Sequence, residues 1–124
     1  MLAVVGMHLL ERRQYADSEP LLRECLAIRA KQLPDSWLLF NTRAMLGRAV
    51  LGQKKYAEAE PLLLEGYEGM HKRLEQIPPP GRVRLAEAIE ALVELYEATG
   101  QEEKAGPWRQ KLKAAAAEKP GGGR

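Results

Sequence analysis

Apolar residues recur every three or four positions along most of the chain, a spacing that places them on one face of an α-helix. The clearest stripe runs through Tyr56, Ala59, Leu63, Tyr67, Met70, Leu74 and Ile77. Similar stripes, separated by turn-forming residues, predict six helices. We expect these helices at residues 2–12, 15–32, 37–53, 56–76, 83–99 and 101 to about 117. The predicted fold class is therefore all-α.

Three of the breaks between these helices have a clear signal in the sequence. Pro34 ends the preceding helix, and Asp35 or Ser36 can cap the next one. Gly100 is expected to stop the helix before it. The run Ile-Pro-Pro-Pro-Gly-Arg at 77–82 predicts a stiff, polyproline-like turn. It is either a spacer or a ligand for a proline-reading domain, and the spacer is favoured because recognition needs a longer exposed segment.

The hydrophobic pattern repeats itself along the chain. KYAEAEPLLLE at 55–65 is a near copy of QYADSEPLLRE at 14–24, and Pro107 marks a weaker third copy. The offset is 41 residues between the first two units and 46 between the second and third. Such periods mark stacked supersecondary units. We expect an α-α superhelix of three antiparallel helix pairs, in units of about 1–34, 35–78 and 81–117, with a flexible tail at 118–124.

The first predicted helix is shorter than its counterpart. The second unit's first helix is expected to begin near Ser36, and the equivalent position in the first unit would precede Met1. Either the chain is a fragment of a larger protein, or its apolar start packs on a partner. Self-association through this truncated helix face is one form of the second alternative.

The composition excludes several functional classes. The 19 basic and 17 acidic residues leave a net charge of +2, too small to predict nucleic-acid binding. No apolar run approaches the length of a membrane span, and no signal peptide is recognisable. The single cysteine, Cys25, cannot form an internal disulfide and suits a reducing compartment. A cytoplasmic protein without membrane or nucleic-acid partners is predicted.

No arrangement of side chains predicts catalysis. His8 and His71 lie on different predicted helices, without cysteines or carboxylates at metal-ligand spacing. Asp17 and Glu58 lie in first turns, where carboxylates favour the helix dipole. We therefore expect no catalytic residues, no metal and no cofactor, and no enzyme activity.

Two sequence segments carry a resemblance to a known family. The second unit reads Arg43-x2-Leu46-Gly47-x2-Val50 and then Ala59-x3-Leu63. This resembles the tetratricopeptide repeat (TPR), whose pattern is W-x2-L-G-x2-Y followed by A-x3-F. The long period is similar to that of kinesin-light-chain-like repeats. Residues 40–56, 95–101 and 108–112 further resemble the C-terminal repeats of large planctomycete-type bacterial serine/threonine kinases. The chain itself has none of the motifs of a kinase domain.

The resemblance implies a groove lined by the first helix of each pair, which receives a protein or peptide. The family's groove-facing positions fall on Met7, Leu10, Asn41, Ala44, Arg48, Leu51, Glu87, Glu90, Glu94 and Glu97. The spacing of the four glutamates independently places them opposite the apolar stripe of their helix. This row is either a solvated helix face or a selector of basic peptides.

The resemblance implies a non-catalytic interaction scaffold, part of a larger signalling protein. Two other hypotheses remain open. One is a structural spacer or oligomerisation segment of a kinase-linked repeat array, with no peptide ligand. The other is a remnant of a kinase regulatory region with no separate activity.

Overall fold

The computed structural model describes residues 2–117, and within that range it contains helices and no strand. The predicted all-α fold class is therefore confirmed. The tail predicted at 118–124 lies outside the described residues. The six α-helices are α1 (Leu2–Glu11), α2 (Tyr15–Gln32), α3 (Trp37–Gly52), α4 (Tyr56–His71), α5 (Val83–Ala98) and α6 (Glu102–Ala117). Two short 3-10 helices, η1 (Leu74–Gln76) and η2 (Pro79–Arg82), join α4 to α5.

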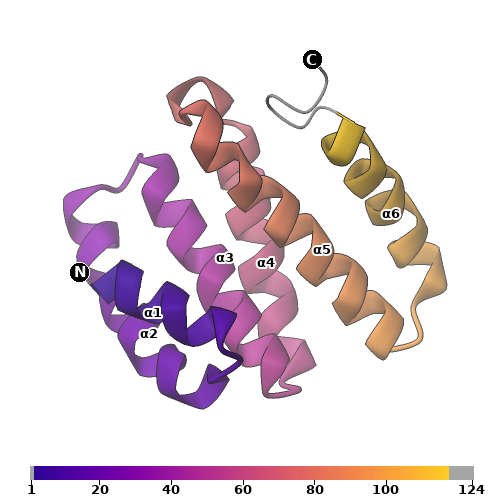
Figure 1. Cartoon of the computed structure of the whole chain (residues 1–124), viewed down its shortest axis with the longest axis horizontal. Helices are drawn as coiled ribbons and strands as arrows, with labels where there is room; N and C mark the ends of the chain where they lie inside the picture. Colours follow the sequence, from indigo (N-terminus) through magenta and orange to yellow (C-terminus); the bar gives the residue numbers. More distant parts are fainter. Residues whose placement is uncertain (1, 118–124) are drawn as a thin grey trace.

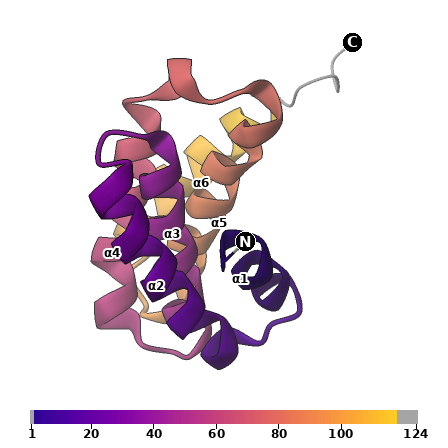
Figure 2. The same ribbon diagram turned by 90° about the vertical axis from the view of Figure 1, so that its left-hand side faces the viewer.

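The helices form three antiparallel pairs, α1/α2, α3/α4 and α5/α6, which stack side by side (Figure 1). The second helix of each pair also packs on the first helix of the next, α2 on α3 and α4 on α5. The first helices α1, α3 and α5 lie on the side of the molecule away from α4, and α1 stands to the right of α3 in Figure 2. The result is a helical repeat fold in which each pair is covered by its neighbours.

The core runs continuously through all three pairs, and small residues set the distance between helices within a pair. Gly6 packs on Leu22, and the equivalent Gly47 packs on Leu63. Gly66 of α4 lies against the backbone of α3, where a Cβ would sit 2.7 Å from the Ala44 nitrogen. The largest fully buried side chains include Leu22, Met45, Leu46, Leu63, Met70, Leu92 and Leu95. Helices α3 and α4 are thus in backbone contact.

The helix predicted at 56–76 is shorter in the structure. It ends at His71, and Leu74–Gln76 turns as a 3-10 helix instead. There the Gln76 side chain accepts a hydrogen bond from the Trp37 nitrogen at 3.1 Å. Arg73 binds Asp35 of the same neighbouring turn. These contacts hold the tightened turn against the start of α3.

The prediction of a polyproline-like turn at 77–82 is wrong for most of that segment. Pro78 is extended, with ψ of 152°, but Pro79–Arg82 forms η2. Proline fixes φ near −65° and leaves ψ free, so it fits a 3-10 turn as well as a polyproline helix. The Gly81 nitrogen donates to the Pro78 carbonyl at 2.8 Å, which closes the turn.

The cap at Ser36 is confirmed, because its Oγ accepts from the Leu38 nitrogen.

One repeat position has a left-handed backbone in all three units. Arg13, Lys54 and Gly100 each lie two residues after the end of the first helix of their pair, with φ of 62°, 66° and 71°. This conformation costs a residue with a Cβ about 1–2 kcal/mol, whereas glycine adopts it freely. Only the third unit has the residue that suits the turn, and the predicted stop at Gly100 is confirmed.

Replacing Lys54 with glycine is therefore expected to stabilise the protein. Relief of the backbone strain outweighs the extra freedom of glycine in the unfolded chain, and a net gain of about 0.5–1 kcal/mol is expected. Gly100→Ala should lower the free energy of unfolding by a similar amount. Urea denaturation of the two variants measures both. A loss of stability in Lys54→Gly would contradict the prediction.

A glutamate at one repeat position joins each pair to the next. Glu19 of α2 accepts from the Gln53 amide at 2.7 Å and pairs with Lys55 at 3.3 Å. The equivalent Glu60 of α4 accepts from the Tyr96 hydroxyl at 2.8 Å and pairs with Lys104 at 3.7 Å. The Gln53 hydrogen bond is the largest cause of a lowered pKa for Glu19. Each second helix thus holds the following unit through one carboxylate.

Candidate functional site

The face formed by α1, α3 and α5 is hollowed in two places. One hollow, of about 130 Å³, lies between α3 and α5. Its walls are Tyr15, Arg48, Leu51, Gly52, Glu87, Glu90, Ala91 and Glu94. The other, of about 360 Å³, lies between α1 and α3. Its walls are Ala3, Val4, Met7, His8, Glu11, Arg29, Leu38, Asn41, Met45 and Arg84. We call them the acidic hollow and the apolar hollow.

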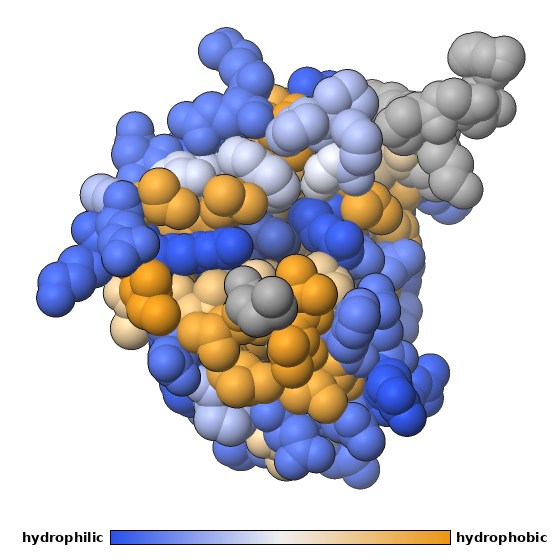
Figure 3. Space-filling view, turned by 60° about the vertical axis from the view of Figure 1, so that its left-hand side comes forward, coloured by the Kyte–Doolittle hydropathy of each residue, from blue (hydrophilic) through white to orange (hydrophobic). Residues whose placement is uncertain are grey.

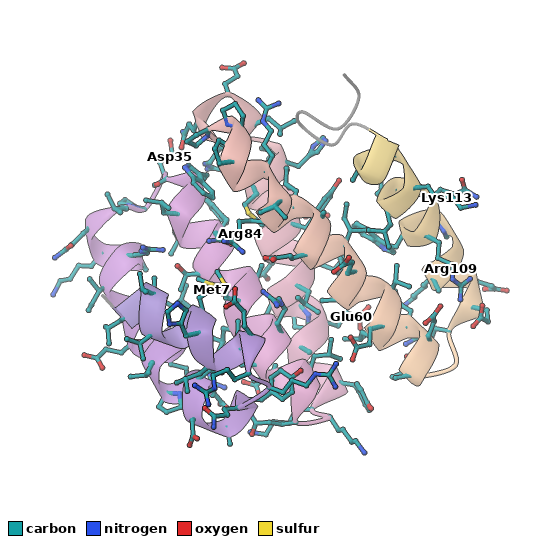
Figure 4. The ribbon with its side chains drawn as sticks, viewed as in Figure 1. Met7, Asp35, Glu60, Arg84, Arg109 and Lys113 are labelled. Carbon is teal, nitrogen blue, oxygen red and sulfur yellow. The ribbon has the colours of Figure 1, made fainter. Side chains whose placement is uncertain are left out.

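A bridge of side chains crosses from α1 to α5 between the two hollows. Met7 of α1 and Arg84 of α5 reach toward each other (Figure 4), with 3.6 Å between Sδ and Nη1. Arg84 also binds Glu87 at 2.8 Å, and Arg48 of α3 approaches the same carboxylate at 3.4 Å. Because two guanidinium groups surround Glu87, its charge is compensated within the site.

The other two glutamates of the acidic hollow are uncompensated. Glu90 and Glu94 are exposed, and neither belongs to any ion pair formed within residues 2–117. The walls carry three carboxylates and the single guanidinium of Arg48, a formal charge of −2. Since the two carboxylates lie four residues apart on α5, about 6 Å separates them along the helix axis. This arrangement attracts cationic groups.

Five apolar and five polar side chains line the apolar hollow, and Asn41 is the polar one that is almost buried. Asn41 is only 8% exposed, and its amide makes no hydrogen bond with another side chain or backbone group among the described residues. The surrounding wall includes Met45 and Leu38. A carboxamide offers both a donor and an acceptor, the two groups that a peptide backbone requires. Asn41 can therefore bind a main chain that enters this hollow.

The structure brings together seven of the ten residues that sequence predicts for the groove. Arg48, Leu51, Glu87, Glu90 and Glu94 line the acidic hollow, while Met7 and Asn41 line the apolar one.

Three predicted residues line neither hollow. Leu10 and Ala44 are 2% and 3% exposed and belong to the core. Ala44 faces Gly66 of its partner helix, which explains its burial. Glu97 is exposed, but its carboxylate binds Arg109 of α6 at 2.7 Å. That ion pair draws Glu97 to the α5/α6 end.

Sequence reasoning missed eleven of the eighteen residues that line the two hollows, and four of them show why. Arg84 precedes Glu87 by one turn on the same helix face, so extending the glutamate stripe backward would have found it. Ala91 lies four residues after Glu87, so the spacing of the glutamate stripe also indicates it. Tyr15 is the first residue of α2 and Gly52 is the last residue of α3. The ring of Tyr15 occupies the space beside Gly52. No periodicity indicates that contact.

Other chemistry finds no support in the described part of the chain. Within residues 2–117, no three His, Cys, Asp or Glu side chains are grouped so that they could hold a metal ion. No helix in that range has the length and apolar character needed to cross a membrane. A scan against models of known protein families finds no match, and a search of curated proteins finds no relative.

Proposed function

We propose that this chain is a non-catalytic protein–protein interaction module of the long-repeat TPR type, which binds a basic, extended peptide on the face of α1, α3 and α5. The observation that carries the proposal is the pair Glu90 and Glu94, exposed at the rim of a hollow and without cationic partners in residues 2–117. Solvated glutamates are common on helix surfaces. Their position beside a hollow on the face of α1, α3 and α5 supports a binding role.

The spacing of the two carboxylates suggests the register of the ligand. They lie about 6 Å apart along α5, and alternate residues of an extended peptide lie about 6.6–6.8 Å apart. A Lys-x-Lys segment therefore matches the pair, because the two lysine side chains of an extended peptide point to the same side. The Asn41 amide, in the apolar hollow beyond the Arg84–Glu87 bridge, can bind the main chain of the same peptide.

Reversing the charge of both glutamates is expected to weaken the binding of such a peptide. The probe is a 12-residue peptide with one central Lys-x-Lys segment, titrated by fluorescence anisotropy into the full chain. Glu90→Lys/Glu94→Lys should raise Kd at least tenfold, equivalent to about 1.4 kcal/mol. Raising the salt concentration from 50 to 300 mM should weaken wild-type binding, since the contacts are between exposed charges.

Two controls separate the groove from the net charge of the protein. Glu24→Lys/Glu68→Lys makes the same charge change on exposed positions of α2 and α4, outside both hollows. It should leave Kd within about twofold. A Glu-x-Glu peptide should fail to bind the wild type and should bind the Glu90→Lys/Glu94→Lys variant. Equal losses in the two double variants would show that the acidic hollow is not the binding site.

A further inference from the structure

The outer face of α1 differs from the same face of α3 and α5. Residues 4, 5, 8 and 9 are 41 positions before four α3 residues that are almost completely buried, namely Met45, Leu46, Ala49 and Val50. The equivalent α5 residues, Ala91, Leu92, Leu95 and Tyr96, are also buried. In α1, by contrast, Val4 is 54% exposed and Val5 is 42% exposed. Figure 3 shows apolar side chains gathered over this face.

The helices that precede α3 and α5 pack on them, mainly the second helix of the preceding pair and to a smaller extent its first helix. Helix α2 packs on α3 and α4 packs on α5, each with its N-terminal end beside the C-terminal end of the helix that it covers. An amphipathic helix that runs antiparallel to α1 would make the same contact. A helix on α1 would therefore reproduce a contact that the fold already contains twice.

The polar contacts of these two interfaces indicate which charge a helix on α1 would need. Glu19 and Glu60 lie near the start of the covering helices and bind donors at the end of the covered ones. The donors Gln53 and Lys55 correspond, 41 residues earlier, to Arg12 and Gln14. Both are exposed, and within residues 2–117 Arg12 forms no ion pair. A carboxylate near the start of a helix that covers α1 would form an ion pair with Arg12.

We propose that the outer face of α1 is a second docking site, which binds an amphipathic helix of a partner protein. The apolar stripe of that helix covers Val4 and Val5, and a carboxylate in its first two turns pairs with Arg12. The site does not include the acidic hollow. It meets the apolar hollow at Val4, which lies on the border of the two, whereas Val5 and Arg12 line neither hollow.

A second copy of the chain is a poorer occupant. The helix that a second copy would place on this face is α6, the second helix of the last pair. At the position of Glu19 and Glu60 this helix has Gly106, and it has no exposed large apolar side chain among its described residues. It therefore lacks both the carboxylate and the apolar stripe that the face requires.

The experiment uses the chain's own covering helix as the probe. A synthetic peptide of residues 55–73, which contains α4 and Glu60, is titrated into the full-length chain and followed by calorimetry. Saturable binding is expected, and Val5→Glu should raise Kd at least tenfold. Val83→Glu is the matched control, because Val83 is 49% exposed on α5 outside both hollows. It should leave Kd unchanged.

A charge exchange tests the predicted orientation. A Glu60→Lys peptide should bind the wild-type chain at least threefold more weakly than the native peptide, and Arg12→Glu in the chain should restore the loss. Sedimentation of the chain alone tests whether a second copy occupies the face. A dimer that Val5→Glu dissociates would assign the face to a second copy and overturn the proposal. Absence of saturable binding up to millimolar peptide, or equal binding to Val5→Glu and wild type, would also overturn it.

Discussion

Replacing Gly66 with alanine is expected to destabilise the protein by about 2–4 kcal/mol, the upper end of what overpacking a core costs. The added Cβ would lie 2.7 Å from the Ala44 nitrogen and 2.8 Å from the Phe40 carbonyl oxygen. Both are backbone atoms of α3, so no side chain can rotate out of the way. Relief requires α3 and α4 to separate, which opens the core of the central pair.

Gly106 provides the matched control on another helix. It lies within α6, and a Cβ there would meet no atom within 4 Å. Gly106→Ala should therefore stabilise the protein by up to about 1 kcal/mol, the gain in helix propensity. Urea denaturation followed by circular dichroism measures both variants. If Gly66→Ala were as stable as Gly106→Ala, the backbone contact between α3 and α4 would not exist in solution.

Alkaline pH is expected to weaken the contact between the second and third pairs through Tyr96. Burial of the phenol, together with its hydrogen bond to Glu60, raises the pKa of Tyr96 from 10.0 to about 12. Because the folded state favours the neutral phenol, its contribution is complete below pH 10 and is lost as pH rises through 12. The difference between 10.0 and about 12 corresponds to about 2.7 kcal/mol.

The comparison that isolates this effect is wild type against Tyr96→Phe, unfolded by urea at several pH values between 8 and 12. The stability advantage of the wild type should be constant up to pH 9. It should then fall by about 1.4 kcal/mol by pH 11, since half of the pKa difference has been crossed. Burial also raises the pKa of Tyr67, so Tyr67→Phe serves as a second reference. An advantage that does not change with pH would exclude the proposed role of the phenol.

Helix positions could be predicted because apolar spacing and turn residues are local signals. The range predicted for α2, 15–32, agrees with the structure. The prediction for α4 ran past His71 because Leu74 and Ile77 continue the spacing of three and four. A 3-10 helix has three residues per turn, so it satisfies the same spacing. Only the contacts of Arg73 and Gln76 with the turn before α3 distinguish the two conformations.

The site was predictable where one helix supplies it and less so where helices meet. Glu87, Glu90 and Glu94 share a face of α5 and line one hollow. The angular position of Glu97 on the helix is close to that of Glu90, yet Arg109 of α6 binds it. Ala44 lies in the groove register but faces α4. Such distinctions depend on which neighbouring helix is nearest, information that periodicity does not contain.

The two junctions between successive pairs differ in the group whose pKa the fold shifts, although a glutamate lies at each of them. At the first junction the pKa of Glu19 lies below its ordinary value of 4.5, so the contact is complete above that pH and is lost as acid protonates the carboxylate. At the second junction the critical proton belongs to Tyr96, and alkali removes it. Acid is therefore expected to weaken the Glu19 contact between the first two pairs, and alkali the Tyr96 contact between the second and third.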